Sequence, residues 1–163
     1  MRFKFLVGSS KAEMESDGSR LLTFKEKVVP KILLIDDEET TRCVLGQTIE
    51  KWGYSVIGCS DGTDAWRILR EKNDISLVVT DYMMPGMDGM TLTKSIRKSA
   101  VCTTIPIIMI SGVLALSSIS TMLDDGVSLF LPKPVAVQEL REHLGDLTRD
   151  PGMLESIPTL QAY

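Results

Sequence analysis

Polar side chains follow four apolar stretches of the chain, at or just after the point where each stretch ends. They are Asp36 and Asp37 after residues 31–35, Asp81 after 75–80, Ser111 after 106–110 and Lys133 after 126–131. Apolar runs of this length are typical of buried strands in a parallel sheet, and the carboxyl ends of such strands meet at one edge. The sequence therefore predicts that these five side chains converge on one rim of a sheet.

The predicted cluster has the residue types that phosphoryl transfer needs. Three carboxylates on one rim repel one another and raise each other's proton affinity unless a cation lies among them. Oxygen ligands that leave room for water and phosphate oxygens suit Mg²⁺. Lys133 would add a positive charge and Ser111 a hydroxyl donor, so that a phosphoryl group is positioned and neutralised. Asp81 is the expected nucleophile, because a carboxylate can form an aspartyl phosphate.

The elements that must position this cluster alternate between strand and helix five times. The expected strands are 31–35, 54–58, 75–80, 106–110 and 126–131. The expected helices are 40–52, a helix capped by Asp61, a helix 88–98 that Asp88 can cap, 115–123 and 137–148. The side chains expected to face inward from the first and last helices are Val44, Leu45, Ile49, Trp52, Val137, Leu140, Leu144 and Leu147. This alternation predicts a parallel sheet with helices on both faces.

Composition favours one globular domain within the 163 residues, since 44% of them are hydrophobic and 25% are charged. A net charge of −4 argues against a nucleic-acid binder. The three cysteines, Cys43, Cys59 and Cys102, have no metal or redox spacing, so we expect reduced thiols in a cytoplasmic protein. The longest N-terminal apolar run is too short for a signal peptide or a membrane span.

The two ends of the chain are harder to interpret. Residues 1–30 are predicted to be an N-terminal extension, either poorly ordered or a short hairpin. In the hairpin, the alternating segment 1–7 would pair with 21–24, and the polar stretch 8–20 would be a loop. Residues 31–149 form the predicted domain, and 150–163 a C-terminal tail.

The motifs, in their order and spacing, resemble the receiver domain of two-component response regulators over residues 31–148. They are Asp36-Asp37, Asp81 followed by Met-Met-Pro-Gly-Met-Asp-Gly, Ser111-Gly112 and Lys133-Pro134. The resemblance implies a flavodoxin-like, doubly wound α/β fold, (βα)5, with a five-stranded parallel sheet in the order 2-1-3-4-5. It also implies a cis peptide bond between Lys133 and Pro134.

The resemblance assigns roles to the residues. Asp81 would be the phosphoacceptor, with Lys133 binding the phosphoryl oxygen. Mg²⁺ would be bound by Asp37 and Asp81 directly, by Asp36 through water, and by the backbone carbonyl of Met83. Ser111 and Phe130 would be the switch hydroxyl and the switch aromatic residue. Gly112 would leave the site accessible.

Three positions tune or depart from the family pattern. Phe130 replaces the commoner tyrosine and lacks its hydroxyl group. Met83 and Val113 occupy positions that tune self-dephosphorylation in the family, and both are apolar here. We therefore expect a relatively long-lived phosphorylated state, because neither side chain can orient an attacking water.

The function implied is a stand-alone, chemotaxis-regulator-like receiver that is phosphorylated by a histidine kinase or a phosphotransfer protein. Its downstream protein would bind the face formed by the fourth helix, the fifth strand and the fifth helix. The protein would be a monomer or a phosphorylation-dependent dimer that binds neither nucleic acid nor membrane. It would catalyse only its own phosphorylation and dephosphorylation, and not be an enzyme otherwise.

Other interpretations remain open. The chain could be a receiver module from a larger hybrid kinase or multidomain regulator. A flavin binder would need a Ser/Thr/Gly-rich phosphate loop after the first strand, where this chain has Asp-Asp-Glu-Glu. A haloacid-dehalogenase-type phosphatase would need a second aspartate two residues after Asp81, where this chain has Met83.

Overall fold

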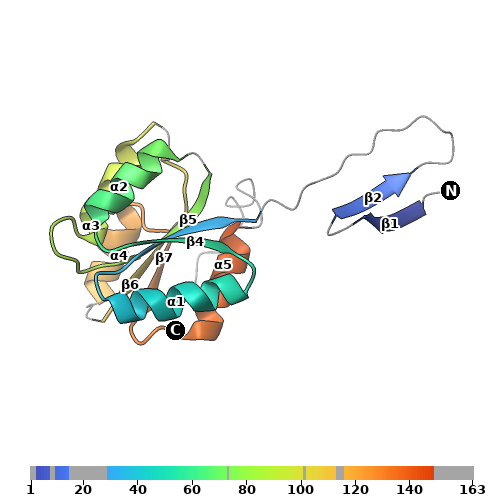
Figure 1. Cartoon of the computed structure of the whole chain (residues 1–163). Helices are drawn as coiled ribbons and strands as arrows, with labels where there is room; N and C mark the ends of the chain where they lie inside the picture. The colour runs from blue at the N-terminus through green and yellow to red at the C-terminus, as the bar shows by residue number, and fades with distance from the viewer. Residues whose placement is uncertain are drawn as a thin grey trace.

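A five-stranded parallel sheet is the centre of the fold in the computed structural model (Figure 1). The structure describes residues 3–7, 10–14, 29–72, 74–100, 102–112 and 116–148. The central strands are β3 (Lys31–Ile35), β4 (Ser55–Cys59), β5 (Ile75–Asp81), β6 (Ile107–Ser111) and β7 (Leu129–Pro132). They lie side by side in the order β4-β3-β5-β6-β7, and every neighbouring pair is parallel. This is the predicted order 2-1-3-4-5 of a flavodoxin-like sheet.

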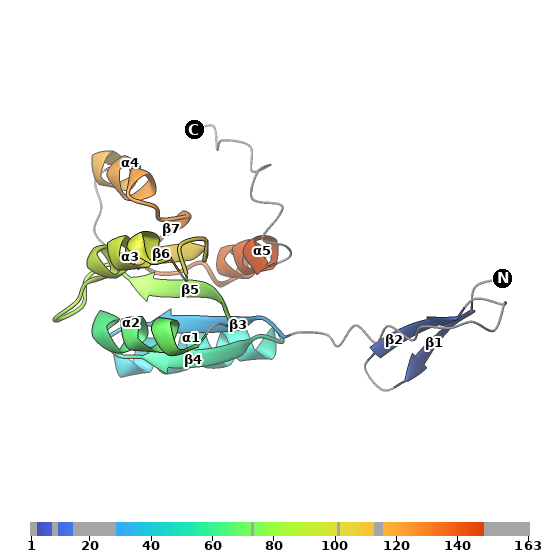
Figure 2. The ribbon, with the colours of Figure 1, turned by 90° about the horizontal axis from the view of Figure 1, so that it is seen from above.

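Helices cover both faces of the sheet. They are α1 (Glu39–Lys51), α2 (Gly62–Glu71), α3 (Gly89–Lys98), α4 (Leu116–Asp124) and α5 (Val137–Thr148). The buried side chains of α1 and α5 pack with one set of strand residues, and those of α2 and α3 pack with the set on the opposite face. Figure 2 shows α2, α3 and α4 following one another across the sheet. Because helices pack on both faces, side chains on both sides of the central strands are buried, and these strands are therefore mostly apolar.

Two helix starts are fixed by aspartate caps that the sequence predicted. The side chain of Asp61 accepts hydrogen bonds from the amides of Thr63 at 2.7 Å and Asp64 at 3.0 Å. Asp88 accepts one from the amide of Thr91 at 2.6 Å. Each cap satisfies amides that have no partner inside the helix, so α2 and α3 begin next to the carboxyl ends of β4 and β5.

The predicted inward face of α1 was wrong at Val44, whose exposed fraction is 59%. The helix approaches the sheet at Gly46, where an added Cβ would lie only 3.7 Å from Leu34 and 3.8 Å from Val56. Val44 is two residues away, or roughly 200° around the helix, and so faces outward. Trp52 is only half-buried, although it packs against the core.

The first residue of α5 also differs from the prediction. Val137 has an exposed fraction of 51%, while Leu140, Leu144 and Leu147 are buried as expected. The apolar contact before the helix is made instead by Val135, which packs against the same core. The helix therefore meets the sheet one turn later than its apolar pattern suggested.

The N-terminal extension contains a two-stranded antiparallel sheet of its own. Strand β1 (Phe3–Val7) pairs with β2 (Ser10–Met14), with Phe3 opposite Met14 and Val7 opposite Ser10. The prediction that 8–20 is a loop was therefore wrong, because strand β2 forms within it. Residues 21–24 and the predicted tail 150–163 lie outside the described residues. Among the helices that are described, none has the length and apolar composition needed to cross a membrane.

Candidate functional site

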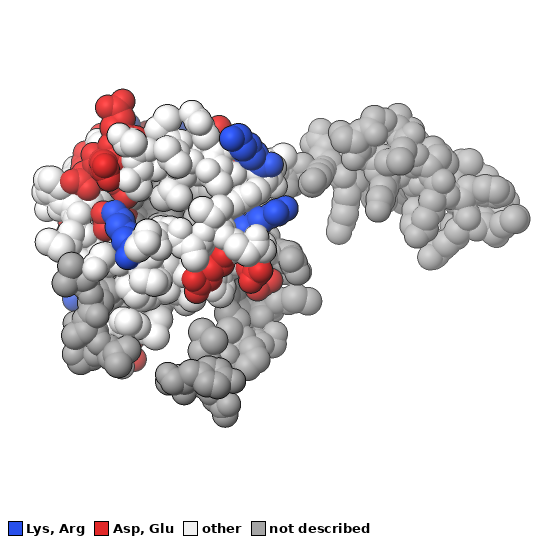
Figure 3. Space-filling view, turned by 90° about the horizontal axis from the view of Figure 1, so that it is seen from below, with Lys and Arg blue, Asp and Glu red and all other residues white. Residues whose placement is uncertain are grey.

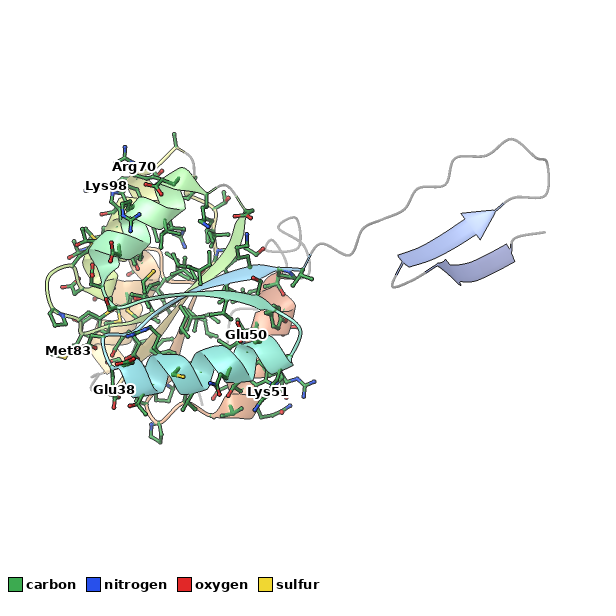
Figure 4. All side chains as sticks on the ribbon, viewed as in Figure 1. Glu38, Glu50, Lys51, Arg70, Met83 and Lys98 are labelled. Atoms are coloured by element: carbon green, nitrogen blue, oxygen red, sulfur yellow. The ribbon has the colours of Figure 1, made fainter. Side chains whose placement is uncertain are left out.

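Three carboxylates meet at the carboxyl edge of the sheet, where β3 and β5 end. A carboxylate oxygen from each of Asp36, Asp37 and Asp81 lies within 4.8 Å of the other two. Asp36 and Asp81 are 2% and 9% exposed, whereas Asp37 faces solvent. Figure 3 shows acidic side chains gathered at the left end of the face in view, the same end at which Figure 4 labels Glu38 and Met83.

Lys133 joins the two buried carboxylates. Its ammonium nitrogen Nζ lies 2.5 Å from Oδ2 of Asp81 and 3.2 Å from Oδ2 of Asp36. The lysine directly follows β7, and its backbone amide donates to the carbonyl of Ser111 at 2.8 Å. The bond from Lys133 to Pro134 is cis, as the family resemblance implied. The structure thus brings together side chains from three parts of the chain that the sequence predicted to converge.

The charges in this cluster perturb one another. Burial raises the pKa of Asp36, although the amide of Glu38 and the ammonium of Lys133 both act in the opposite direction. Burial alone would lower the pKa of Lys133, but hydrogen bonds to Asp81 and Asp36 outweigh it and the net shift is upward. Lys133 is therefore a cation at neutral pH, and the site presents carboxylates with a fixed positive charge beside them.

The backbone around Asp81 is held in place by a close helix start. Met83 donates its amide to Oδ1 of Asp81 at 3.3 Å, and the amide of Tyr82 bonds to the carbonyl of Ile110 at 2.9 Å. Gly89, the first residue of α3, lies so close that a Cβ there would be 2.2 Å from the carbonyl oxygen of Asp81. The motif that follows Asp81 in the sequence therefore ends in a glycine because the helix must touch the strand end.

Arg42 is a residue of the site that sequence reasoning missed. Its guanidinium donates to the backbone carbonyl of Asp36 at 2.7 Å, and its side chain covers Gly58, where a Cβ would lie 3.5 Å from Arg42. The amide of Glu38 also donates to Oδ1 of Asp36, at 2.9 Å. The available signal was a single arginine in the first turn of a helix that follows a run of acidic residues, 36–39.

The predicted switch residues lie on β6 and β7, and the described tuning residue, Met83, follows β5. Ser111 ends β6 and is 3% exposed, and Phe130 is half-buried on β7 opposite Met109. Met83 is 67% exposed, and Gly112 also faces solvent. Val113 lies outside the described residues. The structure thus puts the serine at the rim and the phenylalanine two strand positions before its end.

The arrangement has the chemical groups that a divalent cation and a phosphoryl group require. The donor set is three carboxylate oxygens in a small volume with an exposed side at Asp37, and hard oxygen ligands of this kind suit Mg²⁺. The lysine beside Asp81 supplies a charge that can neutralise a phosphoryl oxygen. Fold and site together define a flavodoxin-like α/β domain with an acidic, lysine-containing rim.

Comparison with known proteins identifies the family. Residues 32–145 match the family model of the response regulator receiver domain. The chain belongs to this family and is a receiver domain of the two-component signalling type. Solved structures agree. A receiver domain protein from Clostridium thermocellum has 30% identity and a TM-score of 0.71, and the match covers 77% of this chain and 99% of the Clostridium chain. The receiver domain of the Francisella response regulator 1452 has 27% identity and a TM-score of 0.69, with 74% and 97% covered.

The relatives are of two lengths. The chemotaxis protein CheY1 of Helicobacter pylori is 35% identical over 115 residues, which are 70% of this chain and 93% of CheY1. The two-component response regulator-like PRR37 of Oryza sativa is 35% identical over 119 residues, or 72% of this chain, but the match spans only 16% of that protein. The family therefore includes both short chains of this domain and long proteins that contain it.

Proposed function

We propose that Asp81 accepts a phosphoryl group from a phosphohistidine of a histidine kinase or phosphotransfer protein. An oxygen of the Asp81 carboxylate forms the new bond to phosphorus, while the phosphorus–nitrogen bond breaks and its electron pair stays on the histidine. The observation that carries this proposal is the pair of short contacts from Lys133 to Asp81 and Asp36 beside the third carboxylate. These contacts support the proposal, because they join the proposed nucleophile and proposed metal ligands to a cation in one cluster.

Mg²⁺, when bound, would neutralise charge on the transferred phosphoryl group. Asp37, Asp81 and the backbone carbonyl of Met83 would hold it directly, and Asp36 through water. Asp36 suits this role because its Oδ1 is already fixed by the amide of Glu38. The ammonium of Lys133 would move from the carboxylate of Asp81 to a phosphoryl oxygen, since phosphorylation replaces the carboxylate's charge with a larger one.

The output we propose is binding of a downstream protein. Ser111 and Phe130 would act as the switch, because they lie on the two strands, β6 and β7, that flank α4 in the chain. Two of the elements that form the proposed face carry exposed apolar side chains: Leu123 on α4 is 47% exposed and Val137 on α5 is 51% exposed. A hydroxyl that shifts toward the phosphoryl group would bias this face between two states.

Two enzyme classes fit less well than this binding role. A flavin phosphate would meet four acidic side chains after β3, because Asp36 to Glu39 occupy the loop and the helix start. A phosphatase of the dehalogenase type would need an acid at Met83, which offers only a thioether. The chemistry we propose is therefore limited to the protein's own phosphorylation and dephosphorylation, with the phosphoryl group long-lived. A larger parent protein would keep the same site.

The proposal is tested by incubating the protein with a small phosphodonor and Mg²⁺. One hydroxylamine-labile phosphoryl group is expected per chain, measured by intact mass. Asp81→Asn should abolish labelling while circular dichroism stays unchanged. Asp88→Asn is the matched control, because asparagine also caps helices and this carboxylate caps α3 outside the acidic cluster. Full labelling of the Asp81→Asn variant, or repeated release of phosphate, would refute the assignment.

A further inference from the structure

A groove between α2 and α3 lies outside the acidic site. It has a volume of about 480 Å³ and is lined by Trp66, Arg70, Ser95, Lys98 and Ser99. Arg70 and Lys98 lie in the last turns of the two helices and Trp66 in the middle of α2, whereas the first turns meet the carboxyl edge of the sheet. Each helix has ten residues and is therefore about 15 Å long, so the groove is remote from Asp81. A pocket of this size can hold a small molecule.

The groove carries two cations that lack an acidic partner among the described residues. Arg70 comes from α2 and Lys98 from α3, both face solvent, and Figure 4 labels them near each other, away from Met83. Neighbouring cations are used within the fold: Arg67 pairs with Asp64 at 3.0 Å, and Lys94 pairs with Asp125 at 3.1 Å. The two cations that line the groove are thus available to an external anion.

The wall of the groove is aromatic. Trp66 is half-buried and packs against the core under α2 and α3, which holds its ring while leaving part of it open. The ring of a tryptophan stacks on planar molecules and attracts them whatever their hydrogen-bonding pattern. A ring beside two cations therefore favours a ligand with a flat apolar part and an anionic part.

Cations in the last turn of a helix have an ordinary role, because they complement the partial negative charge of the helix end. The same partial charge disfavours a bare anion deep between two helix C-termini. An anion is expected at the tips of Arg70 and Lys98, held there by a second contact with Trp66. This combination selects against free inorganic phosphate.

We propose that the groove between α2 and α3 binds a small molecule that carries both a planar aromatic ring and a phosphate, of which a nucleoside monophosphate is the simplest kind. The ring stacks on Trp66, and the phosphate bridges Arg70 and Lys98. The site is separate from Asp81, because none of its lining residues belongs to the acidic cluster.

Tryptophan fluorescence gives a direct test with the full chain. The sequence has two tryptophans, so Trp52→Phe leaves Trp66 as the reporter. Titration with AMP should change its emission saturably, with an affinity in the millimolar range or tighter. Adenosine and inorganic phosphate, each offering half of the recognition, should bind roughly tenfold more weakly. No saturable change with AMP, or equal affinity for phosphate alone, would overturn the proposal.

Charge reversal distinguishes a specific site from general attraction to a surface. Arg70→Glu combined with Lys98→Glu should weaken AMP binding roughly tenfold or more. Lys51→Glu, an exposed cation on α1, is the matched control and should leave the affinity unchanged. Should the reversed variant lose its circular dichroism spectrum, the neutral pair Arg70→Gln and Lys98→Gln replaces it. Unchanged AMP affinity in the folded variant would refute the site.

Discussion

The guanidinium of Arg97 donates from Nε to the backbone carbonyl of Gly126 at 2.9 Å, and so ties the end of α3 to the turn before β7. Another nitrogen of the same group, Nη1, lies 2.8 Å from the carbonyls of both Thr103 and Ile105, in the segment before β6. Burial lowers the pKa of Arg97, and its hydrogen bonds are to neutral carbonyls. One side chain thus connects the end of α3 with the segments that lead into β6 and β7.

Arg97→Lys should lower the free energy of unfolding by about 2 kcal/mol, because a point charge cannot replace a planar group that reaches three carbonyls. Urea denaturation measures this change. Arg67→Lys is the matched control, since that arginine is exposed and only pairs with Asp64 and Glu71 on its own helix, and a change below about 0.5 kcal/mol is expected. Equal effects of the two substitutions would contradict the role assigned to Arg97.

The contact between Gly89 and Asp81 leads to a second prediction. Gly89→Ala should destabilise the protein by about 2 kcal/mol or more and reduce phosphoryl labelling, because a Cβ would press on the carbonyl of the acceptor residue. Gly46→Ala serves as the control, since its added Cβ would meet Leu34 and Val56 at ordinary distances of 3.7 and 3.8 Å, outside the acidic site. Labelling rates and thermal unfolding are measured on both variants. A Gly89→Ala protein with normal labelling would show that the strand end can shift freely.

Local sequence patterns predicted the parallel sheet and the acidic rim, because each polar side chain of the site follows a buried strand and parallel strands end on one edge. The strand order was predicted from the family resemblance. The predictions from local patterns failed where contacts between residues far apart in the sequence determine the orientation of a helix or the partner of a side chain. The inward face of α1 includes Gly46, and a glycine contributes no apolar signal to the helical period. Arg42 and Arg97 bind backbone carbonyls, and a carbonyl has no signature in the sequence.

The cysteines should differ sharply in reactivity. Cys43 is exposed on α1, whereas Cys59 and Cys102 are 6% and 2% exposed. Burial, reinforced by Asp64 and Asp61, raises the pKa of Cys59 to about 11, so little thiolate forms near neutral pH. An alkylating reagent should therefore modify one thiol in the native protein and all three after denaturation, as counted by intact mass. Rapid labelling of native Cys43→Ser protein would contradict the burial of the other two.

The acidic rim should make stability depend on pH and on divalent cations. The pKa of Asp36 is raised in the folded state, so its contribution to stability is fully present below the ordinary value of 3.8 and is lost as pH rises through the higher folded value. Without metal, Asp36→Asn should therefore raise the melting temperature at neutral pH, and this gain should shrink as pH falls toward 3.8. Melting curves in a chelator measure both effects.

Added Mg²⁺ should reverse the ranking, because a cation that binds only the folded state stabilises it by mass action. The wild-type melting temperature should rise with Mg²⁺ concentration, and that of Asp36→Asn should rise less, since one of three converging carboxylates is gone. Asp88→Asn, which changes a carboxylate that caps α3, should respond like the wild type. An equal response of all three proteins would place the cation elsewhere than at Asp36, Asp37 and Asp81.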